Sequence, residues 1–321
     1  MPSIASPAHR VPLEIWRTIF RICLGSELAD TEPEGVLAEY QRLLASFVFI
    51  TGDYRKKESI RGRLSLVCRF WRDALVDMDD MIVVTGRQRW IWPPGRNIDR
   101  ANRVIYVTET LSILFIDDYY RAPRSKKPYT IDPSQLHGSI VQLDGVMLGS
   151  KKVAEPSQSN DVAIKALSSD SCERFNLQAL WHTRFQNLVA LKISSGYPFH
   201  APDHLSPLSL PSLRCLLLCV ASNQSEGNQN GRLCKWTFPG LVAFQLGTLD
   251  VIPRLKDDLI HFLRVHAETI EELVFTDRVS LPPDMDKILP RLRLYEYHDT
   301  RRRTSVNPLV TRARQRGADR A

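Results

Sequence analysis

The 321-residue sequence contains few cysteines and no long apolar segment. Its six cysteines never form a C-x-x-C pair and are too few to form a disulfide scaffold in a chain of this length. We therefore expect free thiols in a reducing compartment: the cytoplasm, the nucleus or both. One of the longest apolar runs, from Cys215 to Ala221, has 7 residues, whereas a membrane-spanning helix needs about 20. Residues 1–10 lack the apolar stretch of a secretory signal, and we expect a disordered tail there. These absences argue against a membrane protein, a secreted protein and a disulfide scaffold.

The sequence also lacks the short motifs that identify many enzymes. It has no G-x-S-x-G, no G-x-G-x-x-G after a strand, no P-loop and no H-E-x-x-H. Two histidines and an aspartate lie within residues 200–204, but Pro202 and the surrounding composition favour an exposed loop over a metal site. The acidic residues in 77–80 lack the other ligands of a calcium loop. We therefore expect a protein that is not an enzyme, with no catalytic residue, cofactor or metal.

Positive charge is concentrated in two segments. Lys and Arg number 43 against 36 acidic residues, a net charge of +7. Residues 55–72 hold seven basic residues and one acidic residue, and residues 296–321 hold seven arginines and three acidic residues. The rest of the chain is therefore slightly acidic. We expect residues 300–321 to be a solvated, disordered basic tail; an import signal, or salt-dependent binding of nucleic acid by the basic segments, is the alternative.

Three amphipathic helices are predicted near the start of the chain. The first begins at Pro12, because proline suits the opening turn of a helix, and its apolar residues follow the helical period. A capping-box pattern predicts the second helix over residues 31–50, ended by Gly52. The third is expected over residues 59–75, and a short apolar run then predicts a strand at residues 81–84.

The second half of the chain carries a degenerate repeat. Segments of the form apolar-Pro-x-Leu recur at residues 210–213, 238–241 and 289–292. Apolar triples of the form h-x-x-h-x-h begin at Leu188, Leu213, Leu241, Ile270 and Leu292. A step of 22 to 29 residues with this form resembles leucine-rich repeats, in which each unit adds one strand to a parallel sheet and a return segment behind it.

This repeat sets the expected fold class. We expect an α+β protein, in which an irregular leucine-rich-repeat-like α/β solenoid follows a helical module; another kind of α/β sheet is the alternative. Residues 254–266 fit a return helix, while triples beginning at Leu111 and Leu143 have irregular spacing. The expected parts are a tail at 1–10, the helical module at 11–80, the solenoid at 81–299 and the basic tail at 300–321.

Two segments of the helical module carry a recognisable motif. The first is Val11-Pro12-Leu13-Glu14-Ile15-Trp16-Arg17-Thr18-Ile19-Phe20, and the second is Leu66-Val67-Cys68-Arg69-Phe70-Trp71-Arg72. Together they resemble an F-box, whose pattern has a Leu-Pro-x-Glu-hydrophobic start, an Ile-Phe pair and a later Val-Cys-x-x-Trp; Val11 stands in place of the leading Leu. Together with degenerate leucine-rich repeats, this is similar to the large F-box-like families of mushroom-forming fungi. One departure is an insert at residues 25–63 with its own helix, which we expect to fold outward and leave the docking surface free.

The resemblance implies a non-catalytic substrate receptor of a cullin-based ubiquitin ligase. Its helices would dock onto a Skp-type adaptor, which joins the cullin, and its repeat domain would recruit an unknown target protein. The implied adaptor contacts are Pro12, Leu13, Ile15, Trp16, Ile19, Phe20, Leu66, Val67, Cys68 and Trp71. Aromatic and basic residues at predicted strand ends suggest target contacts at Lys192, Tyr197, Trp236, Tyr295 and Tyr297. The alternatives are an interaction scaffold outside ubiquitin ligases and nucleic-acid binding through the basic segments.

Overall fold

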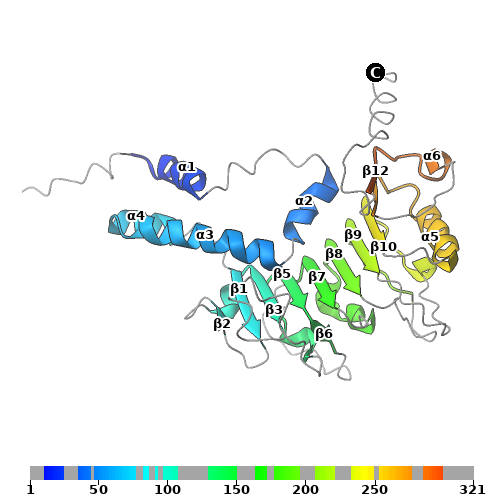
Figure 1. Cartoon of the computed structure of the whole chain (residues 1–321), viewed down its shortest axis with the longest axis horizontal. Coiled ribbons are helices and arrows are strands. Elements are labelled where there is room, and N and C mark those ends of the chain that lie inside the picture. The colour runs from blue at the N-terminus through cyan, green and yellow to red at the C-terminus, as the bar shows by residue number, and fades with distance from the viewer. Residues whose placement is uncertain are drawn as a thin grey trace, which may run out of the picture.

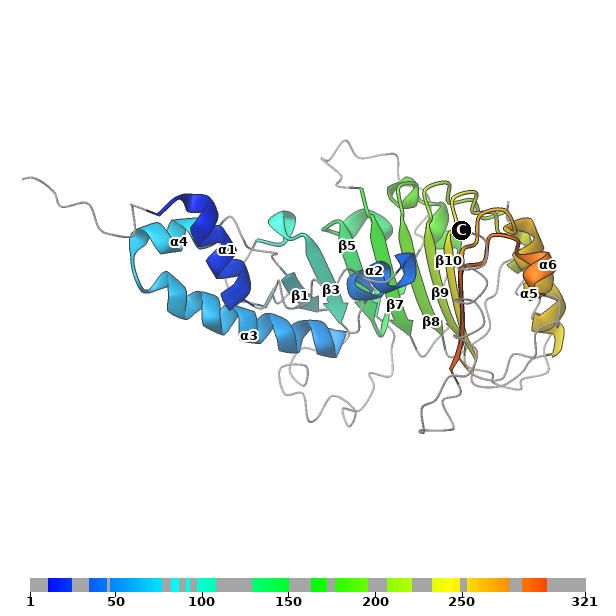
Figure 2. The same cartoon turned by 90° about the horizontal axis from the view of Figure 1, so that it is seen from above.

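A computed structural model of the chain describes its helices, its strands and the short connections beside them (Figure 1). The described residues are 11–24, 35–44, 47–76, 82–86, 91–92, 97–107, 129–149, 163–171, 177–195, 207–220, 233–248, 253–276 and 285–298. Within them, a group of helices from the start of the chain lies at one end of a long sheet, as Figures 1 and 2 show.

In the described part of the chain, four α-helices precede the first strand in sequence, and two come between the last strands. The helices are α1 Leu13–Cys23, α2 Val36–Leu43, α3 Phe47–Ser65, α4 Arg69–Val76, α5 Pro253–Val265 and α6 Met285–Ile288. Short 3-10 helices are η2 Ile98–Arg100, η5 Pro133–Gln135, η6 Leu177–Trp181, η7 Thr183–Phe185 and η8 Leu233–Lys235. The return helix predicted at 254–266 is confirmed as α5, with Leu259, Phe262 and Leu263 buried.

The predicted boundaries of the second and third helices are wrong. Gly52 lies inside α3 rather than at a helix end, because an isolated glycine costs a helix only about 1 kcal/mol and neighbouring residues can sustain it. The helix predicted over 59–75 is instead interrupted: α3 ends at Ser65, a turn follows, and α4 begins at Arg69. The turn carries Leu66 and Val67, whose amides bond to carbonyls three residues back. Both side chains are exposed to solvent in this turn.

Among the described residues, ten strands form one sheet and two form another. The strands are β1 Ile82–Gly86, β2 Ile91–Trp92, β3 Arg103–Val107, β4 Tyr129–Ile131, β5 Ile140–Asp144, β6 Val146–Leu148, β7 Ala166–Ser171, β8 Ala190–Ser195, β9 Cys215–Val220, β10 Ala243–Thr248, β11 Glu272–Thr276 and β12 Leu294–His298. The large sheet has the order β12-β11-β10-β9-β8-β7-β5-β3-β1-β2, and β4 pairs with β6. Its neighbours are all parallel except β1 and β2, which are antiparallel. Apart from β2, which is added outside β1 at the edge, order in this sheet follows order in the chain, which is consistent with a leucine-rich-repeat-like solenoid or another α/β fold.

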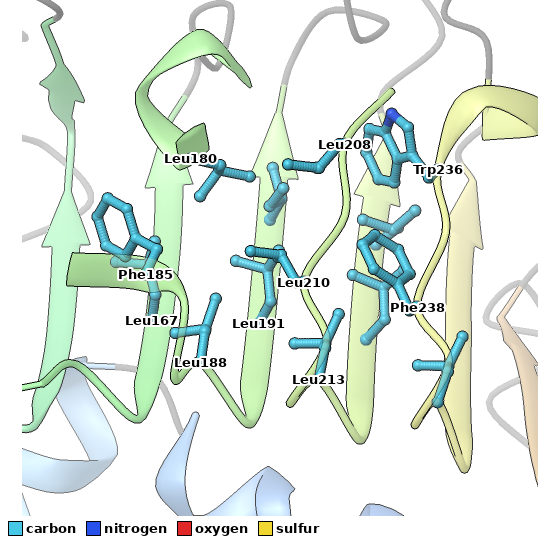
Figure 3. Packing of buried hydrophobic residues seen from close by; sticks show 14 of the residues in the cluster. Leu167, Leu180, Phe185, Leu188, Leu191, Leu208, Leu210, Leu213, Trp236 and Phe238 are labelled. Atoms are coloured by element: carbon cyan, nitrogen blue, oxygen red, sulfur yellow. The ribbon is translucent and has the colours of Figure 1, made fainter. Parts of the chain in front are cut away.

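The regular register stacks equivalent side chains into rows across the sheet. Two rows face the return segments and form the core; they hold Val104, Val141, Leu167, Leu191, Leu216, Phe244 and Leu273, and then Tyr106, Leu143, Ile193, Leu218, Leu246 and Phe275. Return segments close this core with side chains such as Leu180, Phe185, Leu210 and Phe238 (Figure 3). Each fully buried leucine or phenylalanine of this kind contributes about 1.5–3 kcal/mol through removal from water.

The predicted triples at Leu188, Leu213, Leu241 and Ile270 supply this core, because the second and third residues of each lie in the two rows. The triple that begins at Leu143 does not form one strand. Leu143 belongs to β5, whereas Val146 and Leu148 belong to β6 of the small sheet, after a turn at Gly145 with φ of +66°. The triple at Leu111 lies outside the described residues, as do the predicted tails.

Candidate functional site

The helices α1, α3 and α4 share a small aromatic core. Phe20 and Leu75 are fully or almost fully buried there, with Leu13, Trp16, Ile60, Leu64 and Trp71 packed against them. The ring centroids of Trp16 and Trp71 are 4.8 Å apart, and those of Phe20 and Trp71 are 5.1 Å apart. Because these rings join α1 to α4, they fix the relative position of the two segments that carry the predicted motif.

Both of these segments expose apolar side chains. The exposed fraction is 51% for Ile15, 38% for Ile19, 51% for Ile22, 81% for Leu66 and 60% for Val67. In the described part of the chain, Val265 is the other strongly exposed large apolar residue. Ile15, Ile19 and Ile22 follow the helical period along one side of α1, while Leu66 and Val67 occupy the turn before α4. We call these five residues the apolar stripe.

The ten predicted adaptor contacts divide between the surface and the interior. Pro12, Ile15, Ile19, Leu66 and Val67 are exposed, and Leu13, Trp16, Cys68 and Trp71 are half-buried. Phe20 is fully buried and serves the interior of the module instead of its surface, so we do not retain it as a contact residue. Ile22 was missed, although its position three residues after Ile19 continues the stripe.

The described part of the insert at 25–63 divides between the sheet and the helical core. Its helix α2 lies on the open face of the large sheet, opposite the return segments (Figure 2). Leu37, Tyr40 and Leu44 are buried there against short side chains of the sheet, including Ala190 and Ala243. The second half of the insert, in α3, contributes Ile60 to the helical core. The insert therefore joins the helical module to the sheet.

A carboxylate of the sheet holds the first turn of α2. Glu272, the first residue of β11, is only 7% exposed, and its Oε1 and Oε2 accept hydrogen bonds from the amides of Val36 and Leu37 at 2.7 and 2.6 Å. These amides have no partner within a helix, so the carboxylate satisfies them and complements the positive end of the helix. Gly35 just before them has φ of +113°, and a Cβ there would lie 2.5 Å from Oε1 of Glu272. Nothing in the sequence marked Glu272 as such a residue.

Polar contacts and burial complete the surroundings of α2. The amide of Gln41 bonds to the amide oxygen of Gln245 at 3.2 Å. Burial raises the pKa of Tyr40, while Arg214, which hydrogen-bonds to the phenol, opposes that shift. Burial also raises the pKa of the Cys215 thiol, and nearby Glu272 adds to the effect. Cys215 therefore remains a neutral packing residue rather than a reactive thiolate.

The five predicted target contacts differ in their burial. Lys192 of β8 lies half-buried on the open face, in register with Ser168 and Leu217. Trp236 is buried among the return segments, with its ring centroid 5.9 Å from that of Phe238, so its prediction as a surface contact is wrong; an aromatic residue after η8 packs over the core. Tyr295 is half-buried against the same core. Tyr197 and the side chain of Tyr297 lie outside the described residues.

No protein-family model, no curated protein and no solved structure matches this chain. None of the helices in the described ranges is long and apolar enough to cross a bilayer. In those same ranges, no three His, Cys, Asp or Glu side chains are grouped so that they could hold a metal ion, and the sequence clusters at 77–80 and 200–204 lie outside them.

Proposed function

We propose that this protein is a substrate-recognition subunit of a Skp–cullin–F-box type ubiquitin ligase. Its α1, α3 and α4 module would dock onto a Skp-type adaptor, and its sheet domain, which we take to be a degenerate leucine-rich-repeat solenoid, would recruit the target. The protein itself would supply no catalytic group, because ubiquitin transfer takes place on other subunits of such a ligase.

The observation that carries this proposal is the coincidence of motif and exposure. Five motif positions, Pro12, Ile15, Ile19, Leu66 and Val67, are exposed, while the aromatic residues of the same motif hold the module together. Burying a large aliphatic side chain in a partner's groove contributes about 1 kcal/mol or more, so several such anchors are enough to drive docking of a helix. A concentration of exposed apolar residues in one small module is a common mark of a protein-interaction site.

The position of the insert also supports the proposal. With α2 seated on the sheet, it leaves the apolar stripe uncovered by any described residue. The helices α1 and α4 lie at one end of the sheet, away from the strands that α2 covers, as Figure 2 shows. One surface can therefore hold the adaptor while the other holds a target, which is the geometry that a substrate receptor requires.

Co-purification with a Skp-type adaptor tests the proposal. We expect the full-length protein to bind the adaptor, and Ile15→Glu/Val67→Glu to weaken binding by about a hundredfold or more, since burying each new carboxylate costs at least about 1.4 kcal/mol. The matched control is Val265→Glu, which places the same charge at a residue 49% exposed on the distant helix α5. All three substitutions are at exposed positions and should leave the free energy of unfolding within about 0.5 kcal/mol.

Two outcomes would contradict the proposal. Absence of adaptor binding by the folded wild-type protein would leave the scaffold function as the better account of the sheet. Equal losses in Ile15→Glu/Val67→Glu and in Val265→Glu would show that the adaptor does not bind through the apolar stripe.

A further inference from the structure

The open face of the sheet contains a cluster of mostly short apolar side chains. It is formed by the first open-face position of β7 to β10, together with Leu217 and Val274 from the next row. We call it the α2 seat; its residues are Ala166, Ala190, Cys215, Leu217, Ala243 and Val274. Farther along the same strands the open-face residues are polar, as at Ser168, Lys192 and Gln245. An apolar area with a polar border on the face opposite the core has the composition of an interaction site.

The seat recognises a helix by two features. Its small side chains receive the anchors Leu37, Tyr40 and Leu44, which are spaced i, i+3 and i+7 and lie on one side of a helix. Glu272 at its edge binds two consecutive amides of the first turn through both carboxylate oxygens. Neither feature depends on α2 being part of the same chain. Any short helix with the same spacing and an uncapped first turn presents the same groups.

The helix in the seat is short. α2 has 8 residues, and helices of this length are not stable alone in water. Its principal neighbours are β9 and β10, and it adds no residue to the core of the return segments or to that of the other helices. The strands beneath it retain that separate core on their other face. Removal of α2 would therefore expose the seat without dismantling the sheet.

We propose that the α2 seat is the target-recognition site of the sheet, that its partner is a short amphipathic helix with an uncapped first turn, and that α2 is a built-in competitor that this partner displaces. This inference rests on the target-recruiting half of the proposed function. Adaptor binding is not part of it, so the two can fail separately.

A labelled peptide tests the seat directly. The probe is a fluorescein-labelled synthetic peptide with the sequence of residues 34–46, and the protein is the full-length Leu37→Glu/Leu44→Glu variant, in which two anchors of α2 are lost. By fluorescence anisotropy we expect this variant to bind the peptide at least about tenfold more tightly than the wild type does, because its seat is vacant. Adding Glu272→Gln should weaken binding by about tenfold, the effect of losing a charge-assisted hydrogen bond.

Two controls accompany the peptide. A peptide with Glu at both anchor leucines should not bind, and full-length Val265→Glu should behave as the wild type. Failure of the folded Leu37→Glu/Leu44→Glu variant to bind the peptide, or binding equal to that of the wild type, would overturn the proposal.

Hydrogen exchange of the wild-type protein decides the question even if that variant does not fold. Because a displaceable helix opens locally, we expect amides of α2 to exchange at least about tenfold faster than those of β9, and faster still with excess unlabelled peptide. Exchange of α2 at the rate of β9, unchanged by the peptide, would show that α2 is a fixed part of the fold and would overturn the proposal. Adaptor binding should be unaffected throughout.

Discussion

His266 is a buried histidine whose neutral form supports the last return segments. Its ring lies between Phe238 and Phe262, with centroids 5.8 and 4.3 Å away. Its Nε2 accepts the backbone N–H of Phe238 at 2.9 Å, and its Nδ1 lies 2.8 Å from the carbonyl oxygen of Phe262. Nε2 can accept only when it is unprotonated, so the proton is on Nδ1 and the ring is uncharged.

This arrangement predicts a loss of stability in acid. Burial lowers the pKa of His266 below its ordinary 6.5, and the hydrogen bond to Phe262 offsets this only in part. The unfolded chain therefore binds a proton more readily than the native protein does. The contribution of His266 is fully present above pH 6.5 and is lost as the pH falls below that value.

Replacement of His266 by leucine isolates the effect. In His266→Leu, an apolar side chain of similar volume still lies between the two phenylalanines. The buried N–H of Phe238, however, loses its acceptor, which costs about 1–3 kcal/mol. With about 2–4 °C per kcal/mol for a protein of this size, the melting temperature should fall by about 2–12 °C at neutral pH. Urea unfolding at about pH 7.5 and pH 5.5 measures the free energy of unfolding of the wild type and of the variant at each pH. The difference between wild type and variant should shrink at the lower pH.

The matched control is His261→Leu, because His261 is exposed on α5, the helix that ends just before His266. This variant should follow the wild type at both pH values within about 0.5 kcal/mol. Parallel losses of stability in wild type and His266→Leu between the two pH values would refute the reasoning, since the pH dependence would then arise elsewhere.

Three further predictions concern single side chains. Arg184 is buried and donates through Nη1 to the carbonyls of Pro133 and Leu136, so Arg184→Met should lower the free energy of unfolding by about 1–3 kcal/mol in urea, and no loss would mean that the carbonyls find other donors. Gly35→Ala should accelerate proteolysis within α2, because alanine disfavours φ of +113° by about 1–3 kcal/mol and would collide with Glu272; unchanged cleavage would contradict this geometry. Phe20→Ala should lower the melting temperature and adaptor binding together, since filling the helical core is worth about 3–5 kcal/mol, whereas Val67→Glu should affect only binding.

The sheet was predictable where its repeats are regular. Each parallel strand places its residues in the same rows as its neighbours, so the last strands repeat the same apolar spacing in sequence. Earlier strands break the pattern. In β7 the second core row holds Ser169 where other strands have an apolar residue. Before β5, the first position of the triple, three residues ahead of Val141, is Gly138, whose φ is +82°. A search for apolar triples therefore cannot find these strands.

The candidate sites were predictable to a lesser degree. The motif indicated which segments carry the apolar stripe, but one sequence does not tell that Phe20 is buried while Ile15 is exposed. The apolar face of α2 was evident from its spacing, whereas the surface that buries it lies far along the chain. Helical periodicity reports that a face is buried and not which partner buries it.

The bonds from Glu272 to α2 also affect the order in which the chain can fold. They join residues separated by 236 and 235 positions, so α2 leaves the ribosome long before its seat exists. At synthesis rates of about 5–20 residues per second, this interval lasts roughly 10–50 seconds. During that time the helical module can fold from local contacts, but the apolar side of α2 has no native partner. The chain must therefore tolerate, or a chaperone must shield, an unpaired apolar segment at α2 on every round of translation.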